Sequence, residues 1–242
     1  MPVAMVTGGS RGIGRATARR LGEEGYDVAV GYLDQQPVAA EVVDELSAVG
    51  VRGVAVPGDL AEPGTAERIA DFVESELGAI EILVANAGVA GAPKALTDVS
   101  DEDWERMLAV NLSGTFRLAR RLWPTMLARG FGRIVFISSI AAYTGGVVGP
   151  HYAASKAGLH GLAHSLAQQG AAHGVTVNVV APALVDTDLI PDEDEVREAL
   201  AKSSPVGRLG QPDEVADLVV AIVRNGYLTG QSIVLDGGRH PT

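Results

Sequence analysis

Short apolar runs rich in valine and isoleucine recur along almost the whole chain and alternate with longer amphipathic stretches. Seven such runs predict strands, at residues 3–7, 27–31, 52–56, 81–85, 133–138, 175–180 and 232–236. Nearly all of their residues are apolar, and a strand of this kind is buried on both faces. Helices must then cover both sides of the sheet, with right-handed crossovers between parallel strands. The pattern predicts a single α/β domain with a doubly wound parallel sheet of about seven strands.

The segments between these runs carry the signals of helices. Ser100 stands three residues before Asp103, which predicts an N-cap for a helix over residues 102–128. Pro124 lies inside that helix, where its missing N–H could produce a kink. A second helix is predicted over residues 63–77, where a proline stands at the first position.

The least regular part of the chain is residues 186–210, DTDLIPDEDEVREALAKSSPVGRLG, where a proline and an acidic cluster interrupt the alternation of strands and helices. Long irregular insertions in compact domains are usually functional or disordered. We therefore expect this segment to be a candidate substrate lid. A solvated surface helix is the alternative.

The composition excludes several classes of function. The net charge of −11 and the absence of a basic run argue against binding to nucleic acid or to an anionic membrane surface. Cysteine is absent, which excludes a disulfide framework, a thiolate nucleophile and a cysteine metal site. No run of about 18 apolar residues and no signal-peptide pattern is present. We expect a cytoplasmic protein that binds neither nucleic acid nor membrane.

The stretch VTGGSRGIGRA, residues 6–16, follows the first predicted strand and has two readings. Its GGSRG portion matches the G-x-S-x-G elbow of a serine hydrolase, with Ser10 as the nucleophile. Alternatively, Gly8, Gly12 and Gly14 form a turn that cradles phosphate groups at the start of a helix. Several strands precede the elbow in hydrolases, whereas here the feeding strand is the first. The position favours the phosphate cradle.

Three polar residues are predicted to converge at one edge of the sheet. Tyr152 and Lys156 stand four residues apart in HYAASKAGLHGLAHSL, so they share one face of a helix. Ser139 follows the strand at 133–138, at the carboxyl edge where open α/β sheets bind ligands. Each residue could also have a purely structural role, as a packed helix residue or a strand-end cap.

Together these segments resemble a classical short-chain dehydrogenase/reductase over essentially the full length. The resemblance rests on TGGSRGIG at 7–14, Asp59, the Asn86-Ala87-Gly88 turn, Asn111, and Ser139, Tyr152 and Lys156 in the family's spacing. GRLGQPDEVA at 207–216 and the later TGQSIVLDGG are most similar to the branch of 3-oxoacyl-carrier-protein reductases. The resemblance implies a Rossmann-type fold and an oxidoreductase that reduces a ketone to a secondary alcohol, or the reverse, by hydride transfer.

The family assigns a role to each matching polar residue. Tyr152 would donate the proton, and Lys156 would favour its phenolate, because a free phenol has a pKa of about 10. The resemblance adds that Lys156 binds the nicotinamide ribose, Ser139 orients the substrate oxygen, and Asn111 holds a water in the proton relay. A non-catalytic dinucleotide sensor would have no need of this set.

The resemblance also implies the cofactor-binding residues. They are Gly8, Ser10, Arg11, Gly12, Ile13, Gly14, Tyr32, Asp59, Leu60, Asn86, Ala87, Gly88, Tyr152, Lys156, Pro182, Val185 and Thr187. Two positions depart from the family pattern: Ala85 replaces the first of two asparagines, and Ala183 replaces a glycine.

The cofactor preference depends on the end of the second strand. Tyr32 occupies the place where NAD-preferring relatives have an aspartate that binds the free ribose hydroxyl, and Arg11 could bind a 2′-phosphate. Leu33 stands where a second basic residue is frequent, and Asp34 could repel the phosphate. We predict NADP(H), with an NAD-dependent secondary-alcohol or sugar dehydrogenase as the alternative.

The substrate could be a 3-oxoacyl thioester or a small-molecule carbonyl. Relatives dock an acidic carrier protein through arginines; Arg129 is present here, but Gln168 and His173 replace expected basic residues. The negative net charge also weakens steering of an acidic partner. His160 and His164 stand four apart without an evident third ligand, so no metal is predicted. The family resemblance implies a homotetramer formed through two long helices, here about 102–128 and 152–173, and the C-terminal strand.

Overall fold

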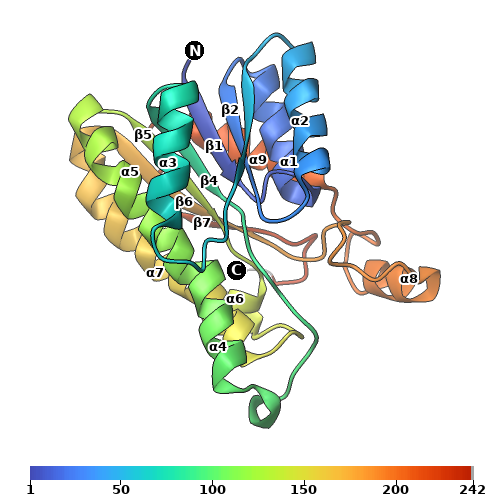
Figure 1. The fold of residues 1–242 in the computed structure, drawn as a ribbon. Coiled ribbons are helices and arrows are strands. Elements are labelled where there is room, and N and C mark those ends of the chain that lie inside the picture. Colours follow the sequence, from blue (N-terminus) through green and yellow to red (C-terminus); the bar gives the residue numbers. More distant parts are fainter. Residues whose placement is uncertain (241–242) are drawn as a thin grey trace.

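The computed structural model describes residues 1–240, in which seven parallel strands form one sheet (Figure 1). The strands are β1 (Val3–Thr7), β2 (Asp27–Tyr32), β3 (Gly53–Pro57), β4 (Ile80–Ala85), β5 (Gly132–Ile137), β6 (Val175–Pro182) and β7 (Ser232–Leu235). Their order in the sheet is β3-β2-β1-β4-β5-β6-β7. This confirms the predicted Rossmann-type α/β fold, and each predicted strand lies within two residues of its observed bounds.

Helices cover both faces of the sheet. They are α1 (Gly12–Glu23), α2 (Gln36–Ala48), α3 (Thr65–Glu76), α4 (Asp101–Leu108), α5 (Thr115–Arg129), α6 (Ala141–Thr144), α7 (Pro150–Gly170), α8 (Asp194–Lys202) and α9 (Pro212–Arg224). One core cluster contains buried residues of α3, α5 and α7, and the other contains buried residues of α1, α2 and α9. The sheet is therefore the middle of three layers.

Successive strand residues belong to opposite clusters, as the two-residue period of a strand requires. Met5 packs with the α3, α5 and α7 cluster, while its neighbour Val6 packs with the other one. Phe136 and Val135 on β5 are divided in the same way. All four side chains are at most 1% exposed. Burial on both faces is the physical reason for the continuous apolar runs.

The helix predicted over 102–128 has an internal irregularity. Ser100 forms the expected capping box: its Oγ accepts from the Asp103 N–H at 3.1 Å, and Asp103 Oδ2 accepts from the Ser100 N–H. A π-helical segment, Ala109–Gly114, then joins α4 to α5. Pro124 lies inside α5, which continues to Arg129. The sequence did not predict the π-helical turn, and such turns are frequent at functional sites.

The segment at 186–210 contains α8, which has no buried residue and is set apart from the sheet in Figure 1. Backbone hydrogen bonds anchor its two ends. The Asp186 N–H donates to Gly210 O at 2.9 Å, and the Val206 N–H donates to Gly237 O at 3.2 Å. A lid function for this segment stays a prediction.

Candidate functional site

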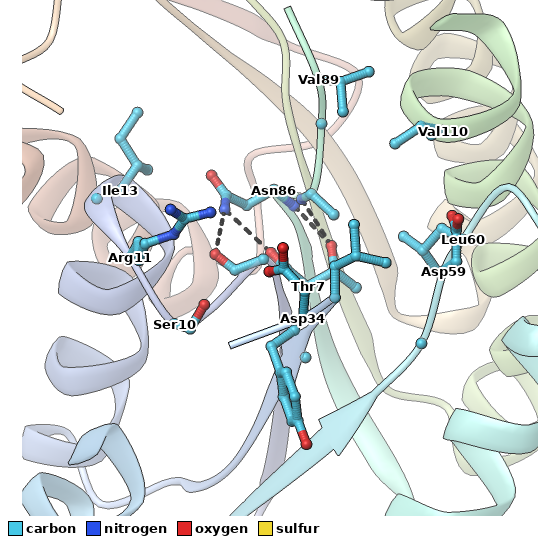
Figure 2. A pocket seen from close by; sticks show the side chains of 18 of the residues that line it. Thr7, Ser10, Arg11, Ile13, Asp34, Asp59, Leu60, Asn86, Val89 and Val110 are labelled. Atoms are coloured by element: carbon cyan, nitrogen blue, oxygen red, sulfur yellow. Dashed lines mark hydrogen bonds between the residues drawn. The ribbon is translucent and has the colours of Figure 1, made fainter. Parts of the chain in front are cut away.

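The site begins where the direction of the sheet reverses. From β1 the chain moves outward to β2 and β3, then returns to β4 on the other side of β1. The loops after β1 and β4 therefore lead away from each other and leave a crevice at the carboxyl edge. Hydrogen bonds join the two loops: Thr7 Oγ1 accepts from the Asn86 N–H at 3.1 Å and the Ala87 N–H at 3.0 Å. Asn86 Nδ2 donates to Gly8 O at 3.0 Å (Figure 2).

A cavity of about 430 Å³ lies at this crevice. Ser10, Arg11 and Ile13 come from the turn after β1, while Asp59 and Leu60 line the opposite side (Figure 2). The predicted cofactor residues that line it are Gly8, Ser10, Arg11, Gly12, Ile13, Tyr32, Asp59, Leu60, Asn86, Ala87, Gly88 and Thr187. The structure thus brings together residues from five separate segments, at the carboxyl ends of β1, β2, β3, β4 and β6. Most of the predicted cofactor residues share one cavity.

The glycine turn is shaped so that a dinucleotide can approach its backbone. Gly8 has φ of 59°, a left-handed conformation that favours glycine, and a Cβ there would lie 3.0 Å from Ala87 Cα. Gly12 has φ of 49°, and its Cβ would meet Thr187 Cγ2 at 3.0 Å. The turn leads directly into α1, whose N-terminal amides favour an anion. These features fit the pyrophosphate of a nicotinamide dinucleotide.

Gly14 lines neither cavity of the site and acts through packing instead. A Cβ at Gly14 would lie 1.9 Å from Gly8 O and 2.7 Å from Asn86 Nδ2. The turn after β1 and the first turn of α1 can approach this closely only because position 14 has no side chain. The third glycine of a dinucleotide-binding turn commonly has this role.

We expect Gly14→Ala to weaken cofactor binding by at least about 10-fold, because the methyl group forces the glycine turn away from α1. Fluorescence titration of the full chain with NADPH measures the loss. Gly161→Ala is the matched control, since a Cβ at Gly161 on α7 meets nothing within 4 Å. Equal NADPH affinity in the Gly14→Ala variant and the wild type would contradict the assigned packing role.

A second cavity of about 130 Å³ adjoins the first and contains the predicted catalytic residues Ser139, Tyr152 and Lys156. Pro182, the last residue of β6, and Val185, three residues later, also line this cavity. The residues that line both cavities are Ile13, Asn86, Gly88, Val89, Thr187 and Leu189. A ligand that extends along the crevice from the glycine turn therefore ends beside Tyr152.

Tyr152 is held on the first turn of α7 and is partly buried. Burial raises the pKa of its phenol, and the Ser139 hydroxyl opposes this by favouring the phenolate. Lys156 Nζ lies 5.9 Å from the centre of the Tyr152 ring. The expected lowering of the Tyr152 pKa by Lys156 is therefore not the dominant effect here. At neutral pH the phenol keeps its proton.

Lys156 is 5% exposed, and burial lowers the pKa of its ammonium group from 10.5 to about 8. Its Nζ donates to Ile137 O at 2.9 Å. An ammonium group has three N–H donors, and within residues 1–240 Ile137 O is the acceptor found. The remaining donors are at the cavity wall, where a Cβ on Gly88 would lie 3.2 Å from Nζ. They fit the hydroxyls of a cofactor ribose.

Asn111 lies in the π-helical segment and is 1% exposed. Its Oδ1 accepts from the Val89 N–H at 2.8 Å, and its Nδ2 donates to Val89 O and to Ser155 Oγ at 2.9 and 3.0 Å. The amide joins the loop after β4 to α7. A water-holding role for Asn111 stays a prediction, because its side chain lines neither cavity.

Several lining residues of the crevice were not among the predicted site residues, and Thr7 and Arg106 are two polar examples. Thr7 ends an otherwise apolar strand, and a hydroxyl in that position is the signal that could have indicated its role. Arg106 on α4 lines the first cavity, and its Nη2 lies 3.0 Å from Asp59 Oδ2. Arg106 had no sequence signal, because its partner is distant along the chain.

The comparisons with known proteins agree with this geometry. A family model described as short chain dehydrogenase matches residues 2–198. The chain therefore belongs to the short-chain dehydrogenase family and is an NAD(P)-dependent oxidoreductase.

Three similar proteins match along nearly their whole length. The 3-oxoacyl-(acyl-carrier-protein) reductase FabG of Staphylococcus aureus is 35% identical over 240 residues, which are 98% of this chain and 97% of the relative. The short-chain reductase protein NovJ of Streptomyces niveus is 41% identical over 248 residues, 98% and 93% of the two chains. An acetoacetyl-CoA reductase of Allochromatium vinosum is 35% identical over 240 residues, 98% and 97%.

Among the described residues, no helix combines the length and apolar character that crossing a membrane requires.

Proposed function

We propose that this protein interconverts a ketone and a secondary alcohol with NADP(H) by hydride transfer. One observation carries the proposal: the cavity with Ser139, Tyr152 and Lys156 shares its wall with the cavity at the glycine turn. A carbonyl group in the smaller cavity therefore lies between a proton donor and the end of a bound dinucleotide.

The bound cofactor supplies the hydride, which leaves an alkoxide on the substrate that needs a proton. Tyr152 holds that proton on its Oη, and the raised pKa of the phenol keeps it there at neutral pH. Ser139 faces the same cavity and orients the substrate oxygen by hydrogen bonding. Lys156 lines the smaller cavity next to Gly88, which lines both cavities, and its ammonium group binds the ribose there. In the alcohol-oxidising direction the same oxygen must accept a proton, and burial, which raises the pKa of the phenol, disfavours the ionised form that this direction uses.

We propose that the substrate is either a small free carbonyl compound or a 3-oxoacyl thioester. For the thioester, we propose that coenzyme A and not a carrier protein bears the acyl group. Relatives named for both kinds of thioester support the acyl group. Arg129, expected to meet an acidic carrier, lies with its Nη2 2.7 Å from Glu81 Oε1. The neighbouring carboxylate reduces the attraction of Arg129 for an acidic partner.

A substrate panel tests this proposal. NADPH absorbance is followed with acetoacetyl-CoA, the same acyl group on an acyl carrier protein, and small ketones. We expect the coenzyme A ester or a ketone to consume NADPH, and the carrier-bound form to have no higher kcat/KM than its coenzyme A counterpart. Cofactor binding without turnover of any carbonyl compound would favour a sensor and contradict the proposal.

The preference for NADP(H) is proposed from the rim of the larger cavity. Tyr32 at the end of β2 lines it where an acidic residue would bind a free 2′-hydroxyl. Arg11 is half exposed at the same rim, with its Nη1 3.5 Å from Asp188 Oδ2. Asp34 lines the rim too and favours the alternative, an NAD-dependent alcohol or sugar dehydrogenase.

We expect Arg11→Gln to raise the KM for NADPH about 10-fold, because a hydrogen bond to the charged 2′-phosphate is lost. The KM for NADH should change less than twofold. Asp34→Asn is the matched charge variant, and it should lower the KM for NADPH. A wild-type protein with equal or higher kcat/KM for NADH would overturn the proposed preference.

A homotetramer is also proposed, through α4, α5 and α7. Trp104 on α4 and Phe116 on α5 are 40% and 43% exposed. Exposed large apolar side chains on these helices suit packing between two copies of the chain. Size-exclusion chromatography at the monomer mass would contradict this assembly. A cytoplasmic location also stays a prediction.

A further inference from the structure

His160 lies one helical turn after Lys156 on α7, and no step of the proposed mechanism uses it. Its side chain is partly buried among hydroxyl groups. Nε2 lies 2.8 Å from Ser138 Oγ, at the end of β5. Nδ1 lies 2.9 Å from Ser232 Oγ on β7 and 3.3 Å from the Tyr143 hydroxyl on α6. The imidazole therefore connects three elements around the catalytic turn of α7.

The hydrogen-bond inventory assigns the tautomer of this imidazole. Ser138 Oγ lies 3.0 Å from the backbone oxygen of Lys156, which can only accept. The single hydroxyl proton of Ser138 is directed to that carbonyl, so Ser138 Oγ must accept from His160 Nε2–H. Nδ1 is then unprotonated and accepts from Ser232 or Tyr143. A directed chain runs from Ser232 through His160 and Ser138 to the Lys156 carbonyl.

Ser138 is placed where such a chain affects the site. It is 4% exposed, precedes Ser139 directly, and its N–H donates to Val180 O at 2.7 Å. The strand end and α7 are joined at two points: Lys156 Nζ to Ile137 O, and Ser138 Oγ to Lys156 O. The second contact depends on the orientation of the Ser138 hydroxyl, which His160 determines.

We propose that His160 is a positioning residue that acts through Ser138 to hold Ser139 and Lys156 at the distance from each other that carbonyl reduction requires. The expected effect of His160 on catalysis rests on the proposed function. The tautomer of His160 and its hydrogen bond to Ser138 do not depend on it.

The surroundings of His160 support a polar role over simple packing. The core face of α7 consists of Leu159, Ala163 and Ala167, which are at most 4% exposed, and His160 is not among the core residues. Burial, and then the nearby His164, lower the pKa of His160. The group that faces it from α6 is Tyr143, and Ser232 faces it from β7. The neutral form, with one donor and one acceptor, is thereby favoured at neutral pH.

Kinetics of three variants test the inference. His160→Leu keeps the volume but removes both polar contacts, and we expect kcat to fall about 10-fold, because misplacement of reacting groups is costly. The KM for NADPH should change much less than kcat. His160→Gln keeps an N–H donor near the Nε2 position and should restore kcat to within threefold. His164→Leu, one turn away and exposed, is the control and should leave kcat unchanged.

A double-mutant cycle shows whether His160 acts through Ser138. If it does, kcat of the double variant Ser138→Ala/His160→Leu is no lower than kcat of the slower single variant. If the two substitutions instead reduce kcat by independent factors that multiply in the double variant, the inference is overturned. A His160→Leu variant with a lower Tm and unchanged kcat would also overturn it, because a purely structural residue behaves in that way.

NMR of the wild-type full chain gives a readout without substrate. Long-range 1H–15N correlations of the imidazoles distinguish the tautomers, and His160→Gln identifies the signal among the five histidines. We expect His160 to be in the Nε2–H form. In the Ser138→Ala variant the imidazole signal of His160 should shift, whereas that of His164 should not. An Nδ1–H form would overturn the inference whatever the substrate. Absence of carbonyl turnover combined with the expected tautomer would instead disprove the proposed function alone.

Discussion

Tyr152→Phe is expected to lower kcat/KM for carbonyl reduction by about 10²- to 10⁴-fold, the usual contribution of a positioned general acid. The substitution removes only the hydroxyl and leaves the ring in its packed position on α7. NADPH affinity, measured by fluorescence titration, should therefore fall much less than kcat/KM. The loss should appear in kcat, because the proton is needed after the substrate is bound.

The matched control for this variant is Tyr227→Phe, since the Tyr227 side chain is 98% exposed. Full turnover in Tyr152→Phe would exclude Tyr152 as the proton donor. Burial raises the pKa of Tyr152, so wild-type reduction should persist through neutral pH. It should decrease only as the pH rises towards that raised pKa, where the donor form is lost.

Lys156→Met is expected to abolish most activity and yet to stabilise the folded protein at pH 7. Burial lowers the pKa of Lys156 from 10.5 to about 8, so the folded state resists the ionised form. A shift of this size corresponds to roughly 3 kcal/mol of unfavourable free energy for the buried charge. Removal of the charge relieves this penalty, and loss of the hydrogen bond to Ile137 O offsets about 1 kcal/mol of the resulting gain in stability. The variant should be more stable than the wild type by about 2 kcal/mol.

The pH dependence of this difference follows from proton linkage. Between pH 8 and 10.5 the unfolded lysine binds a proton that the folded one has released, so wild-type stability rises with pH in this window. Below about pH 8 both states are protonated and the whole penalty remains. Urea unfolding of both proteins at pH 7 and at alkaline pH measures the change. A wild type that is more stable than Lys156→Met at pH 7, with no narrowing of the difference at higher pH, would contradict this account.

The fold could be predicted largely from local patterns. The continuous apolar runs indicated strands buried on both faces, and the observed sheet has the two core clusters that this burial requires. Ser100 and Asp103 indicated the start of α4 because a capping box is formed by neighbours in sequence. The π-helical turn at Ala109–Gly114 was not predictable, because it depends on contacts of Asn111 with Val89 and Ser155.

In the candidate site, too, features formed by neighbours in sequence were predictable and contacts between distant segments were not. Tyr152 and Lys156 were recognisable from their spacing, which holds in any α-helix. The role of Thr7 depends on Asn86, 79 residues away, and that of His160 depends on Ser232, 72 residues away. Neither pair has a pattern in one sequence, because hydrogen bonds between distant segments form only when the sheet brings their ends together.

The sequence by itself determined the elements, the glycine turn and the spacing of the catalytic helix, since these depend on short-range sterics and periodic burial. The tertiary structure decided which loops meet at the crevice and how solvent is excluded there. The direction of the Tyr152 and Lys156 pKa shifts belongs to this second group. Desolvation is a property of everything packed around a side chain, and residues from many parts of the chain contribute to it.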